Sequence, residues 1–157
     1  MSDISITKQD VLDAQKSWAD GIVDIGRVFL ANGDYKTRAI QHIKTLYAYD
    51  ESEVMFKPSL ASDVPFRKTY DHVLSYFVGG EIPEDKCFAI RPWSKVRFGE
   101  QQIVVNVTSA TAMGNYFFTP SDSDDEMKLE FTFGYLVGKE GRLIINLNHS
   151  SIPYQSK

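Results

Sequence analysis

A histidine and two serines, His149, Ser150 and Ser151, follow an apolar stretch near the carboxyl end of the sequence. Residues 141–154 read GRLIINLNHSSIPY, and their alternation has the period of two that is typical of a β-strand. If Ile145 and Leu147 face a core, the alternation places His149 and Ser151 on that same face. A strand that is apolar first and polar at its inner end predicts the floor of a pocket there.

Two established chemistries fit this stretch poorly. His149 and Ser150 are neighbours in a strand, so their side chains point to opposite faces and cannot pair as base and nucleophile. The sequence also has no GxSxG motif. His42 and His72 lie in different predicted helices, and no HxH, HExxH or CxxC spacing occurs, which argues against a zinc site and for structural histidines.

Hydroxyl groups remain as the candidates for chemistry, and we expect several of them to converge on one cavity. Lys57, next to Pro58, would be suited to hold an anion there. The polar candidates are Tyr47, Ser59, Ser75, Tyr76, Thr111, Asn115, Tyr116, Tyr135, His149, Ser150 and Ser151.

Three helices are predicted in the first half of the chain. Thr7 and Asp10 resemble a capping box, and apolar residues recur at helical spacing from there to about Leu30. Asn32-Gly33 ends this helix, and Asp34 caps a second one that runs to about residue 47. A third helix is predicted from near residue 67 to residue 77, where Gly79-Gly80 stops it.

Strands dominate the second half. A short strand is predicted at 54–56, an extended segment at 88–93, and long strands at 93–98, 102–119 and 128–137, with a hairpin turn at Gly99-Glu100. A final strand lies within 141–154, where Pro153 ends its pairing. Helices followed by antiparallel strands indicate an α+β fold. We expect one domain, 1–157, in which a curved antiparallel sheet packs on about three N-terminal helices as a cone, with the pocket between sheet and helices.

Composition narrows the classes of function. The net charge is −4, which argues against nucleic acid or an anionic membrane as partner. Cys87 is the only cysteine, so no intrachain disulfide can form, and no stretch resembles a signal peptide or a membrane span. We expect a cytoplasmic protein, or one of the plastid stroma if a targeting peptide was removed.

A series of short motifs resembles one protein family along nearly the whole chain. The motifs are GIVDIG (21–26), LYAYD (46–50), FKPSLA (56–61), LSYFVGG (74–80), FAIRPWSKVRF (88–98), AMGNYFFT (112–119), FTFGY (131–135) and NHSSIPY (148–154). They are similar to the iota-class carbonic anhydrases, proteins first grouped with the association domain of calcium/calmodulin-dependent protein kinase II, within the nuclear-transport-factor-like superfamily.

The resemblance implies a cystatin-like cone, a homodimer, and reversible hydration of carbon dioxide to bicarbonate, in several members without a metal and here with no cofactor. It associates Ser59, Tyr76, Ser150 and Ser151 with catalysis, to which we add His149 as a proton shuttle. The substrate-binding candidates that accompany them are Lys57, Tyr47, Thr111, Asn115 and Tyr116.

Two positions depart from the family pattern. Ser59 stands where Thr is common, which keeps a hydroxyl, and Asn148 stands where a first histidine is often found, which removes a possible base. Two alternatives stay open. One is a non-catalytic association or small-ligand-binding module of the same fold, and the other is an isomerase or hydrolase using Asp50, the one carboxylate near a predicted cavity end.

Overall fold

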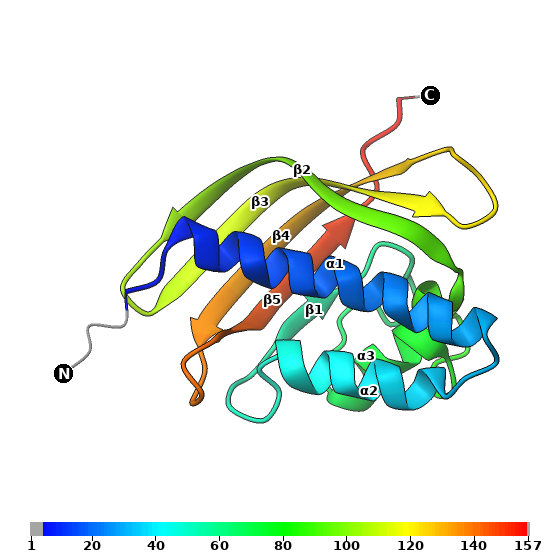
Figure 1. The fold of residues 1–157 in the computed structure, drawn as a ribbon, viewed down its shortest axis with the longest axis horizontal. Helices are drawn as coiled ribbons and strands as arrows, with labels where there is room; N and C mark the ends of the chain where they lie inside the picture. The colour runs from blue at the N-terminus through cyan, green and yellow to red at the C-terminus, as the bar shows by residue number, and fades with distance from the viewer. Residues whose placement is uncertain (1–4, 157) are drawn as a thin grey trace.

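The fold is an α+β arrangement in which helices cover one face of a curved five-stranded sheet (Figure 1). The computed structural model describes residues 5–156. Its helices are α1 (Lys8–Leu30), α2 (Tyr35–Leu46), α3 (Tyr70–Val78) and the short 3-10 helix η1 (Phe88–Ile90). Its strands are β1 (Met55–Lys57), β2 (Trp93–Val105), β3 (Ser109–Pro120), β4 (Met127–Val137) and β5 (Leu143–Ser151).

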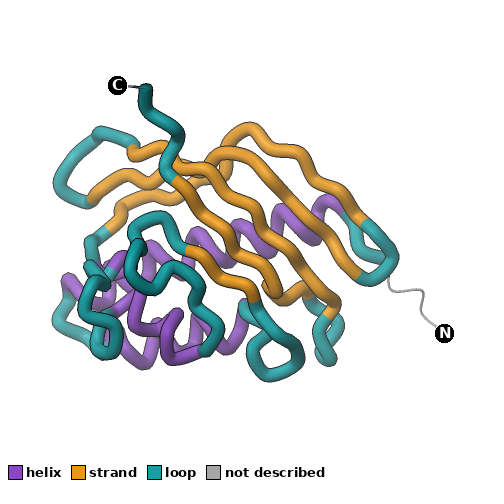
Figure 2. Tube along the Cα trace, turned by 180° about the vertical axis from the view of Figure 1, so that it is seen from behind, coloured by secondary structure: helices purple, strands orange, loops and turns teal. Residues whose placement is uncertain are grey.

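The sheet has the order β1-β5-β4-β3-β2, with β1 parallel to β5 and the other pairs antiparallel. Seen from behind, the outer face of the sheet carries no helix (Figure 2). The inner face and the helices enclose one cluster of buried hydrophobic residues. This confirms the predicted α+β class. The predicted domain, 1–157, includes residues 1–4 and 157, which lie outside the described residues.

The helix ends follow local sequence signals, as predicted. The Thr7 hydroxyl accepts from the Asp10 backbone N–H at 3.1 Å, and the Asp10 carboxylate accepts from the Thr7 N–H at 2.8 Å, so the capping box is confirmed. Asp34 caps α2, and Gly79, with φ +81°, ends α3. The third helix begins later than predicted, because Thr69 is its cap. Within residues 5–156 no helix is long and apolar enough to span a membrane.

The prediction of a hairpin turn at Gly99-Glu100 is wrong. Strand β2 runs through this dipeptide with a register irregularity between Phe98 and Gln101, and the chain reverses only at residues 106–108. A side chain at position 99 would lie 2.6 Å from the Phe117 ring, so the glycine admits that ring beside a bulged strand. The segment expected to be extended at 88–93 instead begins with η1.

A second irregularity sets the orientation of β5. Gly134 on β4 pairs with Leu147, whereas the next β4 residue, Tyr135, pairs with Ile145, so Asn146 is an extra residue in β5. The extra residue reverses the alternation: Ile145 is buried, and from there Asn148 and Ser150 are buried, whereas His149 is exposed. The prediction that His149 and Ser151 share the core face with Ile145 is therefore wrong.

Gly134 makes room for this bulge. A Cβ at position 134 would lie 2.8 Å from the Asn146 side-chain oxygen and 2.9 Å from the Leu147 Cβ. We expect Gly134→Val to lower the free energy of unfolding by about 1–3 kcal/mol, the usual cost of overpacking, in urea titrations. Thr132→Val, on the same strand and face, is the matched control and should change it by less than about 0.5 kcal/mol. Equal stability of the two variants would contradict the bulge.

Candidate functional site

Three hydroxyl groups from separate elements form a hydrogen-bonded chain on the inner face of the sheet. The Tyr116 hydroxyl on β3 donates to the Ser150 Oγ on β5 at 2.5 Å, and the Ser150 Oγ lies 2.5 Å from the Ser59 Oγ in the loop after β1. Tyr116 and Ser150 are buried, with 2% and 5% of their surface exposed, and Ser59 is half-buried. The chain thus leads from the core toward solvent and ends at Ser59.

Tyr76 on α3 lies beside the outer end of this chain. It is 5% exposed, and the backbone of Leu60, the residue after Ser59, lies near enough to its hydroxyl to affect its pKa. Its ring stacks on Phe88 at a centroid distance of 5.5 Å; Phe88 contacts Phe118 at 5.2 Å, and Phe118 contacts Tyr116 at 4.8 Å. The hydroxyls are therefore bordered by aromatic rings.

Burial keeps these phenols protonated. Desolvation raises the pKa of Tyr116 well above its ordinary value of about 10, and the hydrogen bond with Ser150 only partly opposes the rise. Desolvation likewise raises the pKa of Tyr76, with the Tyr116 dipole adding to the increase and the Leu60 backbone opposing it. At neutral pH both side chains are hydrogen-bond donors rather than phenolates.

A second polar cluster lies deeper on the same face. The Tyr47 hydroxyl accepts from the Trp18 Nε1 at 2.9 Å and from the Asn148 Nδ2 at 2.7 Å. Tyr47 and Asn148 are each 3% exposed, and burial raises the pKa of Tyr47. Asn148 is thus a buried partner of Tyr47, two residues before Ser150 on the same face of β5.

The remaining predicted site residues lie on the outer face or in other contacts. Lys57 donates to the Ser150 backbone oxygen at 3.4 Å, Ser151 donates to Glu130 at 3.0 Å, and Asn115 donates to the Leu129 backbone oxygen at 3.4 Å. Thr111 and His149 are exposed. These candidates therefore do not join the inner hydroxyl chain of Tyr116, Ser150 and Ser59, because successive strand residues alternate between faces.

Cavities near the site open on the outer face. Two of about 340 Å³ each share His149 in their lining; one extends to Lys57 and the exposed Phe66, the other to Met113 and Ser151. Neither is lined by the hydroxyl of Ser59, Tyr76 or Ser150. Asp50 is exposed.

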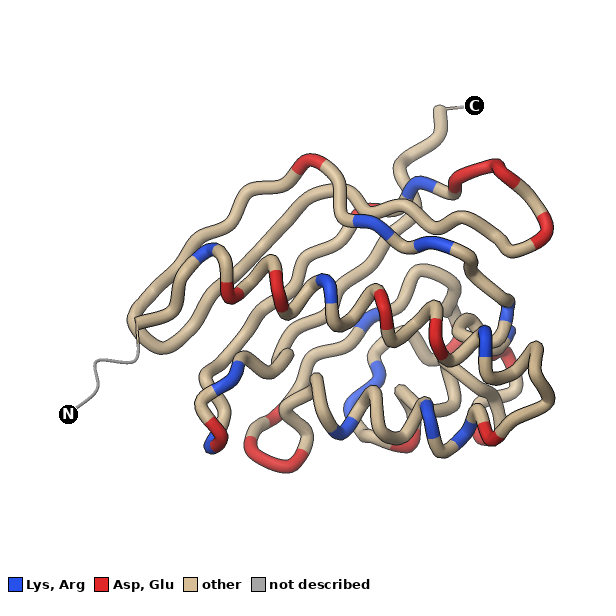
Figure 3. Tube along the Cα trace, in the orientation of Figure 1, with Lys and Arg blue, Asp and Glu red and all other residues tan. Residues whose placement is uncertain are grey.

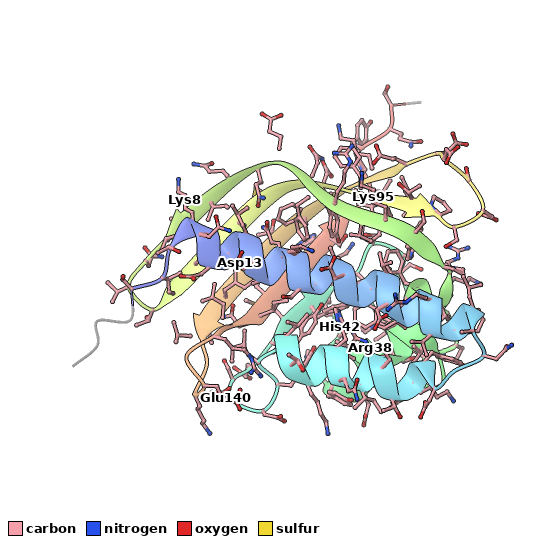
Figure 4. The ribbon with its side chains drawn as sticks, in the orientation of Figure 1. Lys8, Asp13, Arg38, His42, Lys95 and Glu140 are labelled. Atoms are coloured by element: carbon pink, nitrogen blue, oxygen red, sulfur yellow. The ribbon has the colours of Figure 1, made fainter. Side chains whose placement is uncertain are left out.

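Neither His42 nor His72 belongs to a cluster of described residues that could bind a metal ion. His42, labelled on α2 in Figure 4, is 2% exposed, its Nε2 has no hydrogen-bond partner, and desolvation lowers its pKa to about 3. His72 lies 3.5 Å from Glu81. Among residues 5–156 no three His, Cys, Asp or Glu side chains are grouped to hold a metal ion.

Sequence reasoning missed Trp18 and the inward orientation of Asn148 as parts of the polar interior. The signal for Asn148 was present, because an isolated glycine within an alternating strand, here Gly134, indicates a bulge. No local signal marks Trp18, whose spacing fits an ordinary core position of a helix.

Comparison with known proteins identifies the family to which this geometry belongs. A family model described as metal-independent carbonic anhydrase matches residues 9–152. The chain belongs to this family. A metal-independent carbonic anhydrase of Nostoc sp. is 36% identical over 96% of this chain and 76% of its own length.

Solved structures agree. The crystal structure of a cyanobacterial iota-carbonic anhydrase complexed with bicarbonate is 35% identical, covers 99% of this chain and 98% of its own, and has a TM-score of 0.94. A nuclear-transport-factor-2-like protein of unknown function from Pseudomonas putida has a TM-score of 0.66 at 13% identity, covering 96% of this chain and 89% of its own. The second similarity shows the fold alone.

The raised pKa of Tyr116 predicts a pH dependence of stability. The folded protein keeps the phenol proton that the unfolded chain releases near pH 10, so this contribution is complete below pH 10 and is lost as the pH rises. We expect the free energy of unfolding to fall above pH 10, and the Tyr116→Phe variant to have a slope shallower by up to about 1.4 kcal/mol per pH unit. Urea titrations at pH 9, 10 and 11 measure it, with Tyr154→Phe as the control for an exposed tyrosine. Identical slopes for wild type and Tyr116→Phe would contradict the burial of this hydroxyl.

Proposed function

We propose that this chain catalyses the reversible hydration of carbon dioxide to bicarbonate without a metal, through the Tyr116–Ser150–Ser59 hydroxyl chain and Tyr76. The observation that carries the proposal is this buried chain of hydroxyls, ending at a half-buried serine, in a member of the metal-independent carbonic anhydrase family. The bicarbonate complex of the cyanobacterial relative supports the same substrate. Neutral hydroxyls are also not the side chains that form zinc sites, which use Cys, His and carboxylates.

The hydrogen bonds of the chain have one direction. Tyr116 has a single proton, held firmly because its pKa is raised, and it donates that proton to the Ser150 Oγ. The Ser150 and Ser59 oxygens lie 2.5 Å apart, a contact in which either can donate. Because Ser150 accepts from Tyr116, we infer that it directs its own proton to Ser59. The proton of Ser59 is left for an oxygen of the substrate. Each bond polarises the next, so Ser59 is a stronger donor than an isolated serine.

This direction suits the charge that develops in hydration. Water attacks the carbon of carbon dioxide, negative charge grows on the substrate oxygens, and the proton of the water leaves to solvent. Fixed donors that point at the developing charge lower the barrier, and they act most strongly away from bulk water. Ser59 and Tyr76 supply two such donors, and the rings of Phe88 and Phe118 provide the apolar surroundings that carbon dioxide requires.

The two adjacent serines of β5 provide the sharpest test, because they face opposite sides of the sheet. We expect Ser150→Ala to lower kcat for carbon dioxide hydration about 10²–10³-fold, as removal of one transition-state donor does, whereas Ser151→Ala should retain wild-type activity. Stopped-flow hydration with a pH indicator, after exhaustive treatment with chelator, measures both.

Substitutions of Ser59 test whether the hydroxyl chain ends at this residue. Ser59→Ala should match Ser150→Ala, and Ser59→Thr should retain most activity because it keeps the hydroxyl. Wild-type activity that vanishes with chelator and returns with zinc would overturn the metal-free mechanism. Equal losses in Ser150→Ala and Ser151→Ala would overturn the hydroxyl chain.

His149 is not part of this mechanism. It was a candidate proton shuttle, but it is exposed and its neighbour Ser150 points to the opposite face. Cytoplasm or plastid stroma is the proposed compartment, on composition alone.

We also propose that the chain forms a homodimer through the outer face of the sheet. No helix of residues 5–156 covers this face (Figure 2). Met113 on β3 and Val104 on β2 are 61% and 50% exposed, and strand alternation places both on this face. Association of two copies would bury such side chains.

We expect wild type to run as a dimer in light-scattering chromatography and Met113→Glu to run as a monomer at the same concentration. Leu12→Glu, an equally polar change at an exposed leucine on α1, is the control and should remain dimeric. A monomeric wild type would contradict the dimer without bearing on the hydration mechanism.

A further inference from the structure

A buried ion pair lies behind the site, between the loop that carries Ser59 and the segment that follows α3. Arg67 donates through two nitrogens to the two carboxylate oxygens of Asp85, at 2.9 and 2.6 Å. Both side chains are completely buried. Two further donors of Arg67 are used, since its Nε donates to the Val64 backbone oxygen at 2.6 Å and its Nη1 donates to the His72 backbone oxygen at 3.0 Å.

Arg67 also closes a loop whose first residues belong to the site. The Arg67 backbone N–H donates to the Phe56 oxygen at 2.8 Å, so residues 57–66 leave β1 and return to it. Near the start of this loop, Ser59 contacts Ser150 and Leu60 contacts Tyr76. Near its end, Arg67 lies 5.8 Å from the centre of the Tyr76 ring. The same loop therefore contacts the site at both ends.

A second carboxylate holds the middle of the loop. Glu84 accepts from three consecutive backbone N–H groups, those of Ser62, Asp63 and Val64, at 2.8, 3.0 and 2.8 Å. These hydrogen bonds lower the pKa of Glu84 to about 2. Glu84 and Asp85 belong to the segment after α3, the helix that carries Tyr76.

A gain in stability does not explain why this ion pair is buried. A buried ion pair pays a large desolvation cost, and apolar residues of similar volume often give equal or greater stability. The pair is extensively hydrogen-bonded: Arg67 makes four hydrogen bonds, and Asp85 also accepts from the Ser75 hydroxyl at 2.7 Å. Unlike apolar residues, a bidentate ion pair fixes geometry. It sets the distance and the angle between the Ser59 loop and the segment that follows α3.

We propose that Arg67 and Asp85 are positioning residues for the reaction, which hold the Ser59 loop against α3 so that the Ser59 and Tyr76 hydroxyls meet the same substrate. This inference rests on the proposed function. Neither residue touches substrate. A displacement of about 1 Å at a reacting group is enough to cost about 10²-fold in rate.

The test replaces the pair rather than breaking it, because a single substitution leaves an unpaired buried charge, which strongly destabilises the fold. We expect the double variant Arg67→Met/Asp85→Leu to unfold at a urea concentration close to that of wild type, but to lose at least 10-fold in kcat. The double variant Asp24→Asn/Arg38→Gln removes the ion pair between α1 and α2 as a control and should keep wild-type kcat. Arg38 of this pair is labelled on α2 in Figure 4.

A double-mutant cycle separates positioning from general disturbance. In the Ser59→Ala background, Arg67→Met/Asp85→Leu should cost less than 2-fold further, since the hydroxyl that the pair positions is already absent. Losses that simply multiply, or a double variant with wild-type kcat, would overturn the proposal.

Hydrogen exchange tests the loop independently of activity. We expect the amides of Ser62, Asp63, Val64 and Arg67 to exchange at least 10-fold faster in the double variant than in wild type, with the amides of β3 unchanged. Unchanged exchange in the loop would overturn the positioning proposal by itself. An inactive wild type would refute the hydration mechanism instead, so the two failures are distinguishable.

Discussion

One extra residue in β5, Asn146, decides which side chains of the site face the interior. Without it, the strand would present His149 and Ser151 to the core and Ser150 to the outer face, because strand residues alternate. The bulge depends on Gly134 of the neighbouring strand, which leaves room for the displaced Asn146 and Leu147. This irregularity therefore orients two side chains: Ser150, at the centre of the hydroxyl chain, and Asn148, which donates to Tyr47.

A chain of neutral hydroxyls can take over part of what a metal does for a water or a bicarbonate oxygen. A metal stabilises negative charge by its own charge, whereas here the stabilisation comes from donors that are already aligned before the substrate binds. Alignment requires that each proton have one direction. The raised pKa of the buried Tyr116 keeps its proton on the phenol oxygen, from which it is donated to Ser150. Positions of both charge signs are distributed along the described chain (Figure 3), whereas Ser59, Ser150, Tyr76 and Tyr116 are all uncharged.

Local sequence signals predicted the helices. The features that could not be predicted depend on contacts between residues far apart in the sequence, such as the register between strands. The capping box at Thr7 and Asp10 and the stop at Gly79 act within a few residues, so the sequence alone placed them. The face of His149 depends on register with β4, and the Arg67–Asp85 pair joins residues 18 positions apart, which no periodicity reveals. The resemblance to a family named Ser59, Tyr76 and both serines of the HSS motif, but only the structure distinguishes Ser150 from Ser151. On β3, Tyr116 faces the interior. Met113 and Asn115 lie at odd spacings from it and therefore lie on the outer face.

The central claim is that protons point outward along Tyr116, Ser150 and Ser59 toward a substrate oxygen. Neutron diffraction from a deuterated crystal soaked in bicarbonate observes those protons directly. We expect deuterium on the Tyr116 oxygen directed at Ser150, deuterium on Ser150 directed at Ser59, and the deuterium of Ser59 within hydrogen-bond distance of a bicarbonate oxygen. Bicarbonate bound on the outer face beside Lys57 and His149, or a Ser59 proton directed back at Ser150, would contradict it.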